Sequence, residues 1–453
     1  MTPDSVNPLL HCSIIPYFRQ FLNINRSCDT TSIRGHFFVC RILIVCSNLD
    51  HLPLPVIAVL HAVVNLTTCA MAEVRLKWFH TFLFLFQAIL TIADTSTDIM
   101  TCLTYRANDD QQWFAVSLGV TLLTLIVLCI WSVIASTSRT WTKDDADDET
   151  GNPDVIFRST TINVALACLC VGPPLHSVQL FIFCACRFKE LWNSPDGLRI
   201  EKDRLYYLYV HTLNLKMVEG LLESAPQLMI QVYVMVMQRE EAKIELIQMI
   251  SAPVSFLALV WMSTSMEVLR EFEKYNLTFL HNVIIFLGNA GMIAARTLAI
   301  VFFTLYFPWR LPYVIGVHCL VMVATGFLLW RSNRKQDMFV FIFAYSPFYL
   351  FVYSSYYLKK LRGTAPFGAA LQTLSTILWH ALFTAENIVM ISVCFFLHDE
   401  NKWINTSAFA AVLIGNIGGI LIKWLSWCCC FSGQPQGDES IRRPTTIILR
   451  PTN

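Results

Sequence analysis

Pairs of acidic residues stand inside apolar stretches of this sequence, where ionisable side chains are unexpected. Asp94 and Asp98 lie in one such stretch, and Glu219 and Glu223 lie in another, each pair four residues apart. In a helix this spacing places both carboxyl groups on one face. An ionisable group inside a bilayer is costly unless it faces protein, water or a partner, so both pairs are candidates for a functional polar path.

Further polar residues extend each pair into a stripe along its predicted helix. The stripe in the first stretch consists of Gln87, Thr91, Asp94, Asp98 and Thr101. The stripe in the second stretch consists of Lys216, Glu219, Glu223, Gln227 and Gln231. At 1.5 Å per residue, each stripe runs roughly 21–22 Å, which is most of the hydrocarbon thickness. We therefore predict polar tracks that pass through most of a membrane.

Two later stretches repeat the pattern with other residues. One face carries Asn282, Asn289 and Arg296, spaced by seven. Another face carries Gln372, Thr376, His380, Thr384 and Asn387, with Glu386 beside it. Because Lys216, Arg296 and Lys423 accompany the acids, a zwitterionic lipid headgroup suits these tracks better than a simple ion. The residues expected to line a lipid pathway are Asp94, Asp98, Lys216, Glu219, Glu223, Gln227, Arg296 and Glu386.

A structural interpretation of the same residues stays open. Buried polar side chains join helices in many membrane bundles, and here Arg296 would pair with one of the four carboxylates of the two acidic pairs. Two carboxylates at positions i and i+4 repel one another, so a purely structural role does not favour this arrangement occurring twice. The sequence therefore favours a path for a charged species, with Arg296 as the expected counter-charge.

The composition indicates the kind of protein that holds these residues. Of 453 residues, 55% are hydrophobic and only 14% are charged, and the formal net charge is +1. A soluble domain normally has about 25% charged residues. The composition therefore excludes a disordered chain, a nucleic-acid-binding protein with a basic face and an ordinary soluble enzyme. We predict an all-α polytopic membrane protein.

Ten apolar segments follow Trp78 and are the expected membrane helices. They are 78–105, 113–136, 159–186, 206–237, 246–268, 279–306, 311–330, 338–358, 367–397 and 403–430. The third contains Pro173 and Pro174 and the eighth contains Pro347, and basic residues flank both segments on each side. We interpret these two as re-entrant helices, because cytosolic loops collect Lys and Arg. Eight transmembrane helices and cytosolic termini then leave nineteen basic residues inside and five outside.

The order of elements predicts two repeats. Two spans, a re-entrant helix and two more spans occur at 78–277 and again at 278–430, as in transporter-like duplications. Residues 431–453 are then a cytosolic tail. Residues 1–77 are an N-terminal extension of uncertain role, in which residues 1–70 are either cytosolic or interfacial, or not part of the mature protein. Within the spans, Pro226 is expected to kink or loosen its helix, and Gly415 and Gly419 to permit close helix packing.

Other sequence features add little chemistry. Most of the sixteen cysteines lie inside apolar segments as small hydrophobic residues. Cys428, Cys429 and Cys430 end the last span and are palmitoylation candidates, with plain packing as the alternative. The sequence contains no phosphate-binding P-loop and no EF-hand. We therefore expect no cofactor, no metal, no enzymatic activity and movement of the transported species down its gradient.

Several motifs resemble those of the XK-related membrane proteins, the apoptotic phospholipid scramblase family. The stretch Glu219–Gly–Leu–Leu–Glu–Ser–Ala–Pro–Gln–Leu–Met–Ile–Gln–Val–Tyr233 resembles the family's "LFE-FLESAPQL-LQLY" signature. Asp94–Thr–Ser–Thr–Asp98–Ile looks like its "D-x-x-T-D-I" motif. The stretch from Leu166 to Phe181, with Gly172–Pro173, looks like "LLQLGPL", and Arg296–Thr–Leu–Ala–Ile resembles "SRVLAL". The resemblance covers roughly residues 78–430.

The resemblance implies a scramblase that exposes phosphatidylserine at the plasma membrane, with eight spans and two re-entrant helices. It also implies partners: caspases that cleave a cytosolic tail, a single-span chaperone subunit or bulk lipid-transfer proteins. The candidate cleavage positions here are Asp29, Asp147, Asp148 and Asp438. Asp147 and Asp438 are followed by acidic residues, which caspases tolerate badly. No nucleic-acid partner is expected.

We expect a passive phospholipid scramblase in which headgroups move along the polar stripes while acyl tails stay in the bilayer. Such a route removes most of the cost of dragging a charged headgroup through hydrocarbon. Two alternatives use the same sequence features. One is a solute transporter or channel, and the other is a non-catalytic scaffold that recruits lipid-transfer proteins.

Overall fold

A computed structural model describes residues 74–138, 172–194, 198–200, 204–238, 245–272, 278–329, 350, 368–397 and 402–431. This part of the chain is almost entirely helical, as the sequence predicts. Its small exception is a two-stranded antiparallel sheet of β1 (Val74–Leu76) and β2 (Leu198–Ile200), with Arg75 opposite Arg199. Residues 1–73 of the N-terminal extension, the predicted re-entrant segment 338–358 apart from Leu350, and the predicted tail after 431 lie outside these residues.

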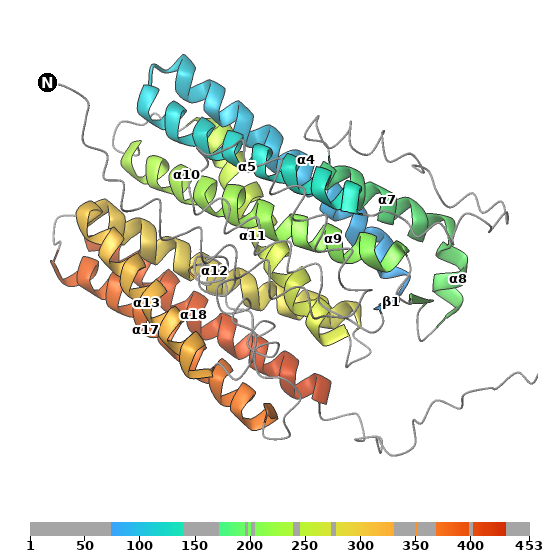
Figure 1. Ribbon diagram of the computed structural model, residues 1–453. Helices are drawn as coiled ribbons and strands as arrows, with labels where there is room; N and C mark the ends of the chain where they lie inside the picture. The colour runs from blue at the N-terminus through green and yellow to red at the C-terminus, as the bar shows by residue number, and fades with distance from the viewer. Residues whose placement is uncertain are drawn as a thin grey trace, which may run out of the picture.

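Among the described residues, the first half of the molecule contains seven α-helices. In chain order they are α4 (Phe79–Ala107), α5 (Gln111–Ser138), α7 (Gly172–Cys186), α8 (Phe188–Asn193), α9 (Arg204–Glu219), α10 (Ala225–Gln238) and α11 (Leu246–Phe272). Between α9 and α10 lies the π-helical turn η4 (Gly220–Ser224). In Figure 1, α4, α5 and α7 form one side of the bundle.

The second half contains α12 (Phe279–Tyr306), the 3-10 turn η6 (Pro308–Arg310), α13 (Leu311–Leu329), α17 (Gly368–Leu397) and α18 (Lys402–Phe431). Helices α13, α17 and α18 form the opposite side of the bundle, and α10, α11 and α12 lie between the two sides (Figure 1). The apolar core follows this division. One cluster centres on α9, α10 and α11, and a second lies between α12, α17 and α18.

Six of the described helices are long and apolar enough to cross a membrane: α4, α5, α11, α12, α17 and α18. The predicted spans 206–237 and 311–330 are also helical, the first because α9, η4 and α10 continue one another. The multi-pass membrane class is therefore clear, whereas the total of eight spans stays a prediction. Helix α7 has 15 residues and begins at the Gly172–Pro173–Pro174 break. At 1.5 Å per residue it covers about 22 Å, less than a full hydrocarbon layer.

The expected irregularity at Pro226 is confirmed and has a specific form. Proline lacks an N–H, and in a helix its ring clashes with the carbonyl group four residues earlier. Pro226 is the second residue of α10, directly after the π turn of η4. A π turn contains one residue more than an α turn, which allows the helix to pass the proline without ending.

The expected close packing at Gly415 and Gly419 is also confirmed. These residues of α18 face Gly291 and Gly288 of α12. A Cβ atom added at Gly415 would lie 2.7 Å from the carbonyl oxygen of Gly291, and one at Gly419 would lie 2.8 Å from that of Gly288. The two backbones can approach this closely because all four positions lack side chains. Helices α12 and α18 accordingly form the most extensive helix pair of the described chain.

Candidate functional site

The polar stripe of α4 is buried in the bundle, as its spacing predicts. Its five residues, Gln87, Thr91, Asp94, Asp98 and Thr101, are each at most 4% exposed. Apolar side chains such as Ile89 and Leu103 are more than half exposed. In a membrane protein, the exposed apolar face is the one that contacts lipid. The stripe therefore faces the other helices, and the apolar side of α4 faces outward.

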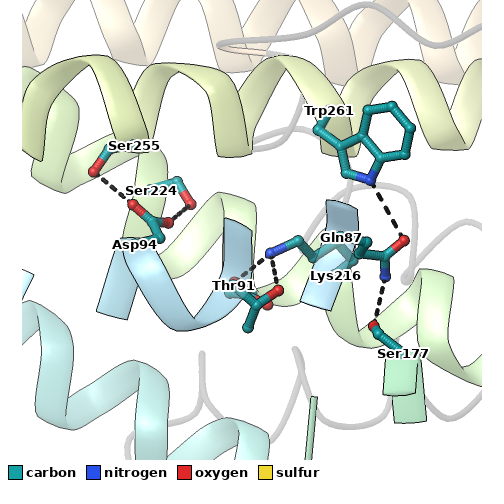
Figure 2. A network of polar contacts seen from close by, with 9 residues as sticks. Gln87, Thr91, Asp94, Ser177, Lys216, Ser224, Ser255 and Trp261 are labelled. Carbon is teal, nitrogen blue, oxygen red and sulfur yellow. Dashed lines mark hydrogen bonds and ion pairs between the residues drawn. The ribbon is translucent and has the colours of Figure 1, made fainter. Parts of the chain in front are cut away.

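Serine and glutamine side chains surround the two aspartates. Asp94 accepts hydrogen bonds of 2.7 Å from the hydroxyl groups of Ser224 and Ser255, one on each carboxyl oxygen. Asp98 accepts hydrogen bonds of 2.9 Å from the Gln231 amide and from the Ser251 hydroxyl. These donors come from η4, α10 and α11, so both aspartates lie where three helical segments meet α4. Figure 2 shows Asp94 between its two serines.

Lys216 is the cation that contacts this group of acids in the described chain. Its Nζ donates a 2.6 Å hydrogen bond to the Thr91 hydroxyl (Figure 2). The same Nζ forms an ion pair with Glu219 on the next turn of α9. Lys216 is 2% exposed and Glu219 is 1% exposed. A buried charge needs a partner of opposite sign, and this pair supplies one within a single helix.

Gln87 and Gln227 extend the hydrogen bonds to neighbouring helices. Gln87 donates to the Ser177 hydroxyl of α7 and accepts from the indole N–H of Trp261, at 3.1 and 3.4 Å. Gln227 donates to the Ser117 carbonyl and accepts from the Ser117 hydroxyl on α5, at 2.9 and 2.8 Å. Gln227 therefore bonds to α5 rather than to the acids near it in sequence.

We call the buried polar side chains around the stripe of α4 the acidic network. Its members are Gln87, Thr91, Asp94, Asp98, Ser177, Lys216, Glu219, Glu223, Ser224, Gln231, Ser251, Ser255 and Trp261. The acids outnumber the lysine, and both carboxyl oxygens of Glu223 lack a hydrogen-bond partner. One carboxyl oxygen each of Asp98 and Glu219 also lacks a partner. The network thus keeps unused hydrogen-bonding capacity in a fully buried place.

The acidic network is closed to the outer surface in this structure, and its use as a lipid pathway stays a prediction. Asp94, Asp98 and Glu223 are each 0% exposed. Trp261 of α11 covers the network near Gln87 and contacts the ring of Phe86 edge-on at 5.1 Å. The surrounding helices cover these side chains, and from inside the bundle serines of η4 and α11 donate to both oxygens of Asp94 and to one oxygen of Asp98.

Arg296 does not join the acidic network, so its predicted pairing with one of those four carboxylates is wrong. Its guanidinium lies 3.0 Å from the Glu386 carboxylate, donates to Asn387 Oδ1 at 2.8 Å and donates to the Leu350 carbonyl at 2.9 Å. The ring of Phe383 lies 5.0 Å from it. All these partners belong to the second half of the chain, because α12 faces α17 there.

His318 of α13 completes this second polar group. Its Nδ1 lies 2.9 Å from the Glu386 carboxylate. Asn387 continues the contacts to Asn416 of α18 at 3.1 Å. The sequence reasoning missed His318 and Asn416, although an imidazole and an amide inside apolar segments are the same signal that identified the acids. Glu386 and Arg296 are thus brought together, but away from the other six predicted pathway residues.

A third polar group joins the two halves. Glu267 of α11 forms a 2.9 Å ion pair with Lys423 of α18, and Asn289 of α12 donates to the same carboxylate at 3.3 Å. Glu267 was missed in the sequence, because it stands at the end of its apolar segment, where a charge is ordinary.

The remaining predicted sites lie beyond what the structure describes. The cleavage candidates Asp29, Asp147, Asp148 and Asp438 fall outside the described residues. Cys428, Cys429 and Cys430 belong to α18, but their side chains are not among those described, and the same holds for Gln372 and Thr376 of α17. Among the described side chains, no group of three or more His, Cys, Asp or Glu residues could hold a metal ion.

Comparisons with known proteins extend over most of the chain. The model of the XK-related protein family matches residues 82–432. The chain is 24% identical over 359 residues to XK-related protein 8 of Tetraodon nigroviridis, which covers 74% of this chain and 79% of that protein. It is 27% identical over 180 residues to XK-related protein 9 of the same fish, covering 38% of this chain and 44% of that protein.

Proposed function

Because this chain belongs to the XK-related family of membrane proteins, we propose that it is a passive phospholipid scramblase that exposes phosphatidylserine at the plasma membrane. The resemblance of its motifs to those of the scramblases in that family is the first support. We place it in apoptosis for the same reason, as a multi-pass protein with both termini in the cytosol. It acts without a cofactor and without enzymatic chemistry.

The acidic network is the observation that carries the proposal. Charged and amide side chains extend along α4 for about 21 Å inside a bundle whose outer face is apolar. Moving a headgroup through hydrocarbon without hydrogen-bond partners costs several kcal/mol for each polar group. A row of carboxyl, amide and hydroxyl groups lowers that cost when a headgroup can reach it. The unpartnered oxygens of Glu223 are groups that a headgroup amine could bind.

The closed network gives the proposal an opening step. Helices α4 and α11 are joined by hydrogen bonds between Asp94 and Ser255 and between Gln87 and Trp261. We propose that these contacts separate in the active state, and that the exposed carboxyl groups then face lipid headgroups. The trigger is cleavage by a caspase or association with a single-span subunit, as the resemblance implies.

Purified protein in liposomes tests the proposal directly. Fluorescent phosphatidylcholine in both leaflets is exposed to dithionite, which bleaches the outer leaflet only, before and after caspase treatment. A scramblase bleaches nearly all of the label without any ion or solute gradient. Saturable solute uptake without lipid movement would indicate a transporter, and neither activity would indicate a scaffold that recruits lipid-transfer proteins.

A matched pair of variants separates the network from general charge effects. Asp98→Asn with Glu223→Gln keeps the shape of both side chains and removes both acids from the network. Asp109→Asn removes an exposed acid in the turn after α4, where a φ of 60° suits asparagine. We expect the double variant to lose flipping and Asp109→Asn to keep it. Unchanged flipping by a folded double variant would refute the role of the network.

A further inference from the structure

Polar contacts between the two halves of the molecule gather at one place. Lys423 of α18 lies 2.9 Å from Glu267 of α11. Asn289 of α12 donates to the same Glu267 oxygen at 3.3 Å and to the Thr264 hydroxyl at 3.2 Å. We call Thr264, Glu267, Asn289 and Lys423 the Glu267 cluster. It connects three helices, of which one belongs to the first half and two to the second.

The glycines of α12 make room for this cluster. A Cβ atom at Gly288 would lie 2.7 Å from Cγ of Lys423. The aliphatic part of Lys423 therefore lies directly on the backbone of α12, and its ammonium group reaches past that helix to Glu267. Long lysine side chains commonly cover apolar surface in this way. The absence of a side chain at Gly288 is thus what allows the ion pair to form.

The ion pair is partly removed from solvent. The Lys423 side chain is 11% exposed and the Glu267 side chain is 26% exposed. Screening is weaker for such pairs than for exposed ones, so their attraction has a larger effect on the position of the helices.

Helix α11 links the Glu267 cluster to the acidic network. On one face it carries Ser251 and Ser255, which donate to Asp98 and Asp94. Near its end it carries Glu267, twelve residues after Ser255, which is about 18 Å along the helix. The part of α11 after Pro253 is one continuous helix that includes both Ser255 and Glu267, so the position of Glu267 against Lys423 restricts how α11 can move relative to α4 at Ser255.

We propose that Glu267 and Lys423 are positioning residues that fix the C-terminal end of α11 in the bundle and thereby keep the acidic network closed to lipid. This inference rests on the proposed scramblase function, because it assigns the resting state of that same site. Breaking the ion pair shifts the protein toward the open arrangement. Contacting residues couple strongly enough to change such an equilibrium about threefold to tenfold.

Lipid flipping without caspase treatment is the first measurement. Lys423→Met keeps the apolar part of the side chain and removes its charge, and Glu267→Gln removes the partner charge. We expect each to raise resting flipping about threefold to tenfold. Exchanging the charges, with Lys423→Glu and Glu267→Lys together, returns flipping toward the wild-type rate. Arg106→Gln, which removes an exposed charge from α4, is the matched control and leaves the rate unchanged.

The reactivity of Cys102 is a second measurement that does not depend on scramblase activity. Cys102 is 3% exposed, and its thiol donates to the Ser117 hydroxyl beside Gln227, next to the acidic network. Alkylation by a membrane-permeant maleimide, followed by mass spectrometry of the Cys102 peptide, reports whether this region opens. We expect faster alkylation in both single variants and a return toward the wild-type rate in the charge exchange.

The two measurements distinguish failure of the scramblase proposal from failure of the positioning role of Glu267 and Lys423. If the chain is not a scramblase, no variant flips lipid, but Cys102 still becomes more reactive when the ion pair is broken. If folded single variants leave both measurements unchanged, or if the charge exchange behaves like the single variants, the positioning role is refuted. Gly288→Ala serves where Lys423→Met does not fold. It displaces the lysine while keeping both charges, and it is expected to raise Cys102 reactivity as well.

Discussion

The close contact between α12 and α18, which we call the seam, predicts that alanine substitution affects stability very differently at two glycines of α18, Gly415 and Gly418. A Cβ atom at Gly415 would lie 2.7 Å from the Gly291 carbonyl oxygen and 3.1 Å from Cβ of Ala295. A Cβ atom at Gly418 would meet no atom within 4 Å. Ordinary contacts begin near 3.4 Å, so Gly415→Ala forces the two backbones apart by several tenths of an ångström.

The expected magnitude follows from two opposing effects. Overpacking a close contact costs about 1–3 kcal/mol, here against backbone atoms that cannot rotate away. Replacing glycine by alanine inside a helix returns about 0.5–1 kcal/mol through the lower entropy of the unfolded chain. Gly415→Ala should therefore lose about 1–2 kcal/mol, whereas Gly418→Ala should lose nothing or gain slightly.

Thermal unfolding in detergent, followed by fluorescence-detected size-exclusion chromatography, measures this difference. We expect Gly415→Ala to lower the apparent Tm by about 2–5 °C and Gly418→Ala to leave it unchanged or raise it slightly. Equal melting of wild type and Gly415→Ala would show that the seam can widen at no cost. An equal decrease of the apparent Tm in both variants would show that the effect comes from α18 itself and not from its contact with α12.

Three further predictions concern two buried polar side chains and one exposed acid. Arg296→Met removes the arginine from Glu386, which keeps its His318 contact; it should cost up to about 3–5 kcal/mol, seen as low folded yield, whereas adding Glu386→Met should recover much of that yield. Ser255→Ala removes a donor to Asp94 and should cost about 1–3 kcal/mol in thermal melts, whereas Ser255→Thr should retain most of the stability. Asp109→Asn, at the exposed turn, should melt within experimental error of the wild type, and a clear loss there would contradict the description of this turn.

The helical spacing of the polar residues and the apolar composition of the segments were sufficient to predict the helices and their buried faces. The stripe from Gln87 to Thr101 follows helical spacing and is buried, because apolar residues occupy the rest of α4. Pro226 and Gly415 have local effects that depend on few neighbours, so their consequences could also be predicted. The division of polar residues among separate groups could not, because it depends on which helices are adjacent in space.

Arg296 illustrates that limit. Four unpaired acids in the first half made it an obvious counter-charge, yet α12 turns this side chain toward α17 and Glu386. The donors to Asp94 and Asp98 were missed for a different reason. Ser251 and Ser255 are common residues in membrane helices, and nothing in their spacing distinguishes a hydroxyl group that binds a carboxylate from one that bonds to its own helix.

The π turn at Gly220–Ser224 changes the direction in which side chains point along its helix. Its surplus residue corresponds to roughly 100° of helical rotation. Compared with an unbroken α-helix, Lys216 and Glu219 before the turn are therefore rotated relative to Gln231 after it. The direction of these membrane-embedded charges is thus set by one extra residue inside a continuous helix, with no loop between α9 and α10.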